Sequence, residues 1–284
     1  MEIWLVRCST LSWIRLFILV LRKGVAGAAV ATVIGNMVSS MFYLRYIIKK
    51  SVFLSISPRD AKRKPAALLH IIAVGLPNGI SSILSGFAST FSNQLLAGYG
   101  TNAIAAMAAA GKATMVITMI QMGICMGVSP LLAYNYGAKN IPRLKEILMK
   151  TSILTFCFGL VATVGCFAGR DLLIGLFLKD TANAEIGKQM MFWLLIASPF
   201  LGFYYLSTNF LQAAGNAFLA TIISVLRQGA LLIPCLYGMH ALMGLTGVAA
   251  AHTASDSISV ITALLCLLSQ YHKISNGQTL KTSS

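Results

Sequence analysis

Charged side chains are scarce in this sequence. Only 10% of its 284 residues are Asp, Glu, Lys or Arg, only seven are acidic, and 57% are hydrophobic. A soluble domain of this size needs a charged surface, so the composition excludes one. The charge-free stretches are each long enough for one or two membrane spans, because a span takes about 20 apolar residues. These stretches cover 66–111, 113–138, 189–226 and 228–255. The sequence therefore predicts an all-α polytopic membrane protein.

Motifs for covalent chemistry and metal binding are also missing from the sequence. The six cysteines are scattered singly and form no CxxC pair, so neither a disulfide framework nor a zinc site is expected. The sequence has no nucleophile motif, no HExxH and no glycine-rich phosphate loop. We therefore predict that the protein is not an enzyme, with no catalytic residues, no metal site and no bound cofactor.

The net charge of +15 raises the question of nucleic-acid binding. The basic residues do not form one face, however. They gather at the ends of the apolar stretches, as the positive-inside rule describes for membrane proteins. We therefore predict no nucleic-acid partner. The same rule predicts that segment 45–64, the basic loop 138–150 and the C-terminus lie on the cytoplasmic side.

Turn residues divide the apolar stretches into seven predicted spans. These are 24–48, 66–97, 103–137, 150–169, 189–213, 217–239 and 246–270. Proline inside a span bends the helix and frees a backbone carbonyl, which lipid cannot satisfy. We therefore expect a neighbouring helix or a wet cavity beside Pro77, Pro130, Pro199 and Pro234.

A polar stripe runs along the second predicted span. Asn78, Ser82, Ser85, Ser89 and Asn93 follow one another at steps of four, three, four and four, and so share one helical face. Two interpretations stay open. The stripe lines an aqueous cavity, or it packs tightly against another helix, as small and hydroxyl-bearing residues do in membranes. The two asparagines slightly favour the cavity, because an amide is costly against lipid.

Asp256 is the only acid deep inside a predicted span. A carboxylate there is expensive and is a candidate for carrying a proton or an ion; the alternative is an acid capped in a helix contact. His252 lies one helical turn earlier on the same face. Arg227 is expected to extend to the membrane interface; the alternative is a contact with a loop or a substrate. Gln121 and Asn209, two amides inside other spans, complete the candidates for a substrate or ion pathway.

The stretch "GVSPLLAYNYGAKNIPRLKEIL" (127–148) resembles the cytoplasmic end of a helix in the multidrug and toxic compound extrusion (MATE) family, bacterial NorM/MepA type. Five other segments resemble the family in the same order along the chain, and the resemblance as a whole covers about residues 16–272. The segments are 24–36, 75–82, 209–217, 226–238 and 247–265. The resemblance implies a structural role for the motif residues Pro130, Tyr134, Asn135, Tyr136, Gly137 and Arg143.

The resemblance also implies a fold and an activity. Family members have twelve helices in two six-helix lobes around a central drug cleft, and they export cationic amphipathic drugs in exchange for Na⁺ or H⁺. Asp256 matches an acid common in helix 12 of the bacterial branch. The expected partners are the lipid bilayer, such drugs and a missing N-terminal lobe, and the expected location is the bacterial plasma membrane.

This chain is expected to be a C-terminal fragment of such a transporter, helix 6 plus the six-helix C-terminal lobe (helices 7–12), which would not transport alone. The expected divisions are an aberrant head (1–23), helix 6 (24–50), a cytoplasmic linker (51–65), the lobe (66–272) and a disordered tail (273–284). Alternatives are an inert or regulatory membrane fragment, a lipid-linked oligosaccharide flippase of the same superfamily, and a half-size transporter working as a homodimer.

The head of the chain fits neither a span nor a signal peptide. Arg7 and Arg15 interrupt its apolar residues, and no small-residue cleavage site follows. Codons can be chosen for residues 3–15 that, regrouped one nucleotide earlier, encode a segment typical of the family just before helix 6. We therefore expect one extra nucleotide near the Arg15 codon, and upstream genomic DNA that encodes helices 1–5 in another frame.

Overall fold

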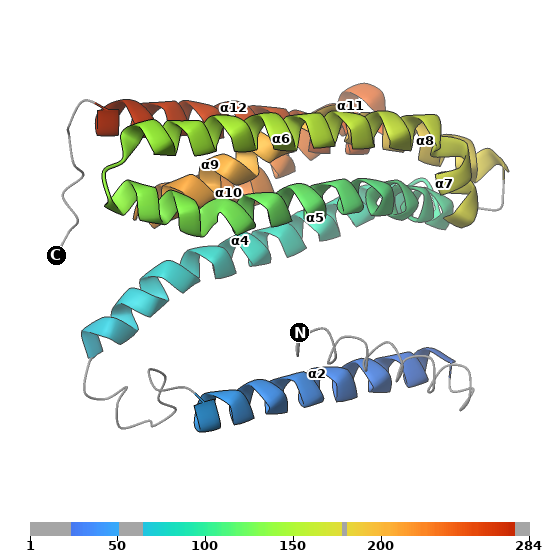
Figure 1. The fold of residues 1–284 in the computed structure, drawn as a ribbon. Helices are drawn as coiled ribbons and strands as arrows, with labels where there is room; N and C mark the ends of the chain where they lie inside the picture. Colours follow the sequence, from blue (N-terminus) through green and yellow to red (C-terminus); the bar gives the residue numbers. More distant parts are fainter. Residues whose placement is uncertain (1–23, 51–64, 178–180, 276–284) are drawn as a thin grey trace. The chain divides into compact units, whose positions relative to one another are not determined.

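The computed structural model describes residues 24–50, 65–177 and 181–275 (Figure 1). The chain separates into two compact units, Met1–Ile71 and Ile72–Ser284. The first unit contains helix α2 (Gly24–Lys50), on which Met37 and Met41 are 67% and 75% exposed, a surface suited to lipid. The predicted head (1–23), nearly all of the predicted linker, and residues 276–284 of the predicted tail lie outside the described residues.

The described residues of the second unit are helical, with no strand among them. The helices are α4 (Pro65–Ala97, which begins in the first unit), α5 (Thr101–Gly137), α6 (Ile141–Ala168), α7 (Arg170–Phe177), α8 (Thr181–Ala197), α9 (Leu201–Ala213), α10 (Ala217–Val225), α11 (Leu232–Met243) and α12 (Leu245–Ser275). A 3-10 turn, η2 (Ser198–Phe200), joins α8 to α9, and a π-helical turn, η3 (Leu226–Ala230), joins α10 to α11. The predicted all-α fold is confirmed.

Five described helices or helix pairs are long and apolar enough to cross a membrane. They cover Thr101–Gly137, Ile141–Ala168, Asn183–Ala213, Ala217–Met243 and Leu245–Ile274. The apolar window of Asn183–Ala213 is 61% buried, against 17–33% in the others. The α8–η2–α9 helix is therefore the centre of the bundle: α5 packs on it, and so does α12 (Figure 1). Large side chains on the outer helices, such as Val161 and Leu265, point away from the core.

Near two of the prolines inside predicted spans, the helix departs from α geometry. Pro199 lies in the 3-10 turn η2, and Pro234 lies four residues after the π-helical turn η3. Pro130 lies inside α5, which continues to Gly137. The side chain of Pro77 is outside the described part of α4.

The turn between α5 and α6 explains why α6 begins earlier than predicted. Lys139 has a positive φ of 54°, and the Asn140 N–H donates to the Asn135 carbonyl, which closes the end of α5. The Asn140 side chain then accepts from the Arg143 N–H at 3.2 Å and caps α6. The helix thus starts at Ile141, not at residue 150, because Asn140 and Pro142 form a helix start.

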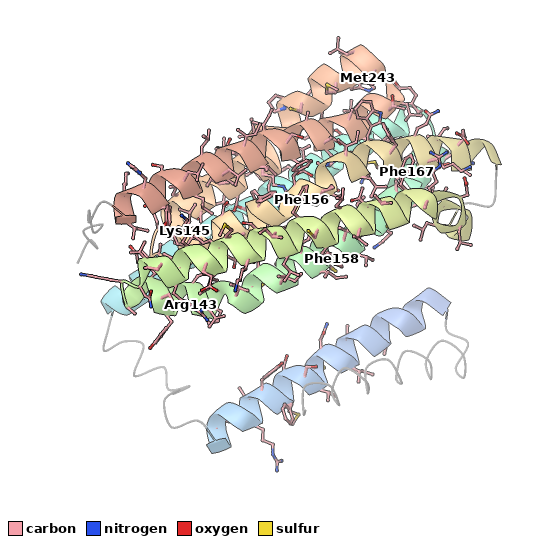
Figure 2. All side chains as sticks on the ribbon, turned by 45° about the horizontal axis from the view of Figure 1, so that its top comes forward. Arg143, Lys145, Phe156, Phe158, Phe167 and Met243 are labelled. Carbon is pink, nitrogen blue, oxygen red and sulfur yellow. The ribbon has the colours of Figure 1, made fainter. Side chains whose placement is uncertain are left out.

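The same turn recurs between α9 and α10. Gly215 has a φ of 78°, and the Asn216 N–H donates to the Leu211 carbonyl at 2.8 Å. The last helix of the second unit, α12, continues to Ser275, three residues into the predicted tail; His272 and Lys273 lie in its last turn, where positive charge is favourable. Figure 2 shows Arg143 and Lys145 at one end of the bundle and Phe167 and Met243 at the other.

Candidate functional site

A polar cavity of about 470 Å³, partly open to the surface, is formed by residues of the second unit. This volume is in the range of cavities that hold drug-sized ligands. Three apolar side chains and one alanine form part of its wall, while most of the rest is polar or charged. The lining residues are Ser85, Ser89, Ser92, Asn93, Ile104, Met107, Ala108, Arg227, Gln228, Leu232, His252, Ser255 and Asp256.

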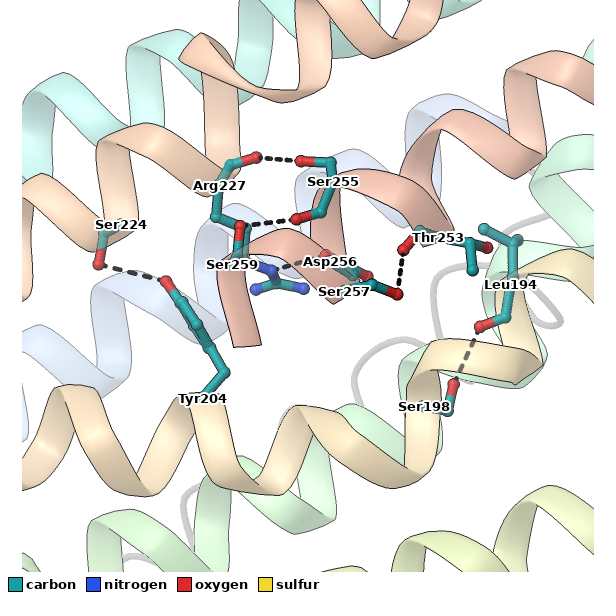
Figure 3. Close-up of polar contacts among 10 residues, drawn as sticks. All are labelled: Leu194, Ser198, Tyr204, Ser224, Arg227, Thr253, Ser255, Asp256, Ser257 and Ser259. Atoms are coloured by element: carbon teal, nitrogen blue, oxygen red, sulfur yellow. Dashed lines mark hydrogen bonds and ion pairs between the residues drawn. The ribbon is translucent and has the colours of Figure 1, made fainter. Parts of the chain in front are cut away.

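A buried ion pair occupies the wall of this cavity. The Arg227 Nε donates to Asp256 Oδ1 at 2.7 Å, with the side chains only 15% and 22% exposed (Figure 3). The expectation that Arg227 extends to the membrane interface is therefore wrong, because its guanidinium has an acid partner within the bundle. Asp256 is likewise paired, so the expensive intramembrane carboxylate is compensated.

The π-helical turn η3 carries Arg227, and α12 holds the turn in place. The Ser255 hydroxyl donates to the Arg227 carbonyl at 3.1 Å, beside the ion pair made by the next residue, Asp256 (Figure 3). Gly229, also in η3, faces Leu84 of α4 so closely that a Cβ at Gly229 would lie 2.7 Å from Leu84 Cγ. Both the backbone and the side chain of Arg227 are thus fixed by neighbouring helices.

Two aromatic rings complete the surroundings of the guanidinium. The Arg227 Cζ lies 4.7 Å from the centroid of the Tyr204 ring and 5.7 Å from that of Tyr205, both within reach of a cation–π interaction. The Tyr204 hydroxyl donates to Ser224 Oγ at 3.3 Å, which anchors the ring (Figure 3). The cation therefore has a carboxylate and two ring faces as neighbours.

The structure places part of the predicted α4 stripe on the cavity wall. Ser85, Ser89 and Asn93 line the cavity, whereas Ser82 is exposed and does not line it. The side chain of Asn78 is outside the described part of the chain. Because the three lining residues recur at one helical face, α4 contributes polar groups opposite η3 and α12.

His252 lines the same cavity, one turn from Asp256 on α12. In the described part of the chain, Asp256 makes its hydrogen bond to Arg227 and none to His252. Among the residues that the structure describes, no group of three or more His, Cys, Asp or Glu side chains is placed to hold a metal ion.

Gln121 and Asn209 lie outside the cavity. Gln121 is fully buried, and its Nε2 donates to the carbonyls of Thr155 at 3.3 Å and Ser198 at 3.1 Å, joining α5 to α6 and η2. The Asn209 Nδ2 donates to the Tyr205 carbonyl at 2.8 Å within its own helix. Their contacts are those of helix packing, although both residues stay candidates from the sequence.

The residues of the turn motif also lie away from the cavity. Asn135 is buried and donates to the Leu131 carbonyl at 2.8 Å, and Tyr136 packs on the buried cluster around Leu132. Pro130, Tyr134 and Gly137 are exposed, and Arg143 forms an exposed ion pair with Glu146 at 2.7 Å.

Sequence reasoning missed three polar residues of the cavity wall, Ser92, Gln228 and Ser255, and the two rings beside Arg227, Tyr204 and Tyr205. All five are ordinary span residues by composition, and no periodic pattern sets them apart. Pro234 was a usable signal, because a proline inside a span marks the place where the helix upstream departs from α geometry.

Fold and cavity together define a class: a multi-pass helical membrane protein with a polar, ion-paired cavity inside one helix bundle. A family model described as MatE matches residues 77–237. The chain is 34% identical over 241 residues to the "Multidrug export protein MepA" of Staphylococcus aureus strain N315, covering 85% of this chain and 53% of that protein. A MepA of Staphylococcus saprophyticus matches at the same identity and coverage. The chain belongs to the MATE family, as its turn motif predicted.

Solved structures agree on the fold. An outward-facing multidrug resistance MATE family transporter of the MOP superfamily has a TM-score of 0.81 at 20% identity, covering 94% of this chain and 60% of that one. The Vibrio cholerae MATE transporter VcmN in its bent form has a TM-score of 0.75 at 23% identity, with 95% and 61% covered. The chain spans about half the length of the curated relatives it matches.

Proposed function

We propose that this chain forms the C-terminal lobe of a multidrug efflux antiporter, with α2 as the helix that precedes the lobe. The observation that carries the proposal is Asp256, a carboxylate held in a polar cavity inside the bundle, where it can exchange one cation for another. The similarity to proteins named multidrug export proteins supports the substrate class.

The coupling ion in this proposal is Na⁺ or H⁺, and the exported substrates are cationic amphipathic drugs. Export by alternating access needs two lobes that rock against each other. Transport therefore requires a second lobe, equivalent to the half of the relatives that this chain does not match. The proposed location is the bacterial plasma membrane, with segment 45–64 and the C-terminus on the cytoplasmic side, since Lys and Arg gather there.

Ethidium accumulation in a bacterial strain without its own drug pumps tests this function. The strain carries the chain alone, the N-terminal half of a MepA relative alone, or both. We expect lowered accumulation only with both, and Asp256→Asn should abolish it. Asp171→Asn is the matched control, because Asp171 is 71% exposed and outside the cavity. Normal membrane amounts of both halves without efflux would refute the transport function; full efflux by the chain alone would refute the need for a second lobe.

A further inference from the structure

The guanidinium of Arg227 is surrounded as a bound organic cation would be. On one side it pairs with Asp256 at 2.7 Å, and its Cζ lies 4.7 Å and 5.7 Å from the ring centroids of Tyr204 and Tyr205. A carboxylate combined with aromatic faces is the chemistry that recognises organic monocations, such as quaternary ammonium and extended aromatic cations.

The backbone of Arg227 is anchored independently of its side chain. Ser255 donates to the Arg227 carbonyl, and Leu84 packs against Gly229 two residues later. If the side chain leaves Asp256, the turn η3 therefore keeps its contacts. The side chain also has somewhere to go, because Gln228, Ser89 and Asn93 line the same cavity of about 470 Å³ and offer polar groups.

We propose that Arg227 is a tethered occupant of a cation site formed by Asp256, Tyr204 and Tyr205. An organic monocation binds there by displacing the guanidinium into the polar cavity. This inference deepens the proposed function, since it names the substrate class and the residue that competes with it. Pairing of Arg227 with Asp256 and binding of the external cation exclude each other, so the arginine returns the carboxylate to a paired state after each release.

The competition has a measurable size. A site that is open for only a fraction of the time binds its ligand with an affinity reduced by that fraction. Because Arg227 pairs with Asp256 in the structure, the open state is the minor one. Removal of the competing cation should therefore tighten binding by about tenfold or more.

The test is ethidium binding, followed by fluorescence anisotropy, to the purified full chain in lipid nanodiscs. Arg227→Gln should bind ethidium about tenfold or more tightly than wild type, and Asp256→Asn should bind more weakly than wild type. The matched control is Lys112→Gln, which removes an exposed cation of α5 outside the cavity and should leave binding unchanged. Nile red, a neutral dye, should bind equally to all variants.

The rings are tested separately. Tyr204→Leu should weaken ethidium binding to the Arg227→Gln protein several-fold, whereas Tyr204→Phe keeps the ring and should not. If Arg227→Gln fails to fold, Arg227→Lys replaces it, because an ammonium lacks the planar fit between rings and carboxylate and competes less well.

Ethidium binding to folded Arg227→Gln that is equal to or weaker than wild type would overturn the inference. So would an equal gain in Lys112→Gln or an equal change for Nile red, because binding would then follow overall charge or apolar partition. These outcomes differ from failure of the proposed function. Unchanged binding with intact two-lobe efflux refutes only the tethered-cation site, and tightened binding without efflux refutes only the transport.

Discussion

Gly159 of α6 lies at a tight contact between three helical segments. A Cβ built on Gly159 would lie 2.9 Å from the Pro199 Cα and 3.2 Å from the Pro199 carbonyl oxygen, and closer still to Gln121 Nε2. The Pro199 atoms are backbone and cannot rotate away. Gly159→Ala therefore forces α6 away from η2 or displaces the Gln121 amide.

The expected cost follows from these contacts. Overpacking a tight site costs about 1–3 kcal/mol. Displacing the Gln121 amide also removes its hydrogen bonds to Thr155 and Ser198, at about 0.5–1.5 kcal/mol each. We therefore expect Gly159→Ala to destabilise the folded chain by about 1–3 kcal/mol where the amide stays in place, and by about 2–6 kcal/mol where it is displaced.

Retention of a monodisperse size-exclusion peak after heating measures the effect in detergent. Gly165→Ala is the matched control, because it lies on the same helix and its Cβ would meet nothing within 4 Å. Alanine there gains up to about 1 kcal/mol of helix propensity over glycine. Gly159→Ala should lose its peak many degrees below wild type, and Gly165→Ala should not. Equal melting of the two variants would refute the tight contact.

Three further predictions concern the turns and one surface ion pair, and the same heating assay measures each. Lys139→Gly should raise stability by up to about 1 kcal/mol and Gly215→Ala should lower it by about 1 kcal/mol or more, since both positions have positive φ. A less stable Lys139→Gly protein or a more stable Gly215→Ala protein would refute the backbone argument. Asn140→Ala should cost about 1 kcal/mol by loss of the α6 cap, and unchanged stability would contradict the cap. The hydrogen bond from Lys188 holds the pKa of Asp171 below its usual range. This pair therefore stabilises the fold at neutral pH, and its contribution is lost as pH falls through that lowered pKa. Asp171→Asn should remove this part of the acid sensitivity, and an unchanged dependence of stability on acid pH would contradict it.

Much of the fold was predictable from the sequence because each membrane helix has a local signal in its own residues. Apolar runs of span length, separated by turn residues, gave the helices. The turn residues around Asn140 correctly predicted where α5 ends. The role of Asn140 as the cap that starts α6 was not predicted. The family was predicted from the resemblance of residues 127–148 to a MATE motif. In the structure, this stretch contains the turn with a positive φ at Lys139 and the cap from Asn140.

The candidate site was predictable only in part. Asp256 and the α4 residues Ser85, Ser89 and Asn93 stood out as polar groups inside spans, and the structure brings them to one cavity. Arg227 stood out as well, but its pairing with Asp256 did not. The pair depends on how η3 packs against α9 and α12, which bring Tyr204 and Asp256 to the guanidinium, and no local sequence pattern marks this packing.

In the second unit, the helices that are interrupted at η2 and η3 receive hydrogen bonds from helices that are not interrupted. A break in a membrane helix exposes backbone carbonyls that lipid cannot satisfy. Beside η2, Gln121 of α5 donates to the Ser198 carbonyl, and beside η3, Ser255 of α12 donates to the Arg227 carbonyl. The breaks near Pro199 and Pro234 are thus each held by a polar side chain from an unbroken neighbour. Gln121 holds a broken helix away from the cavity, Asp256 faces the cavity, and Ser255 does both. The sequence shows all three as polar residues inside spans, and only their partners in the structure separate their roles.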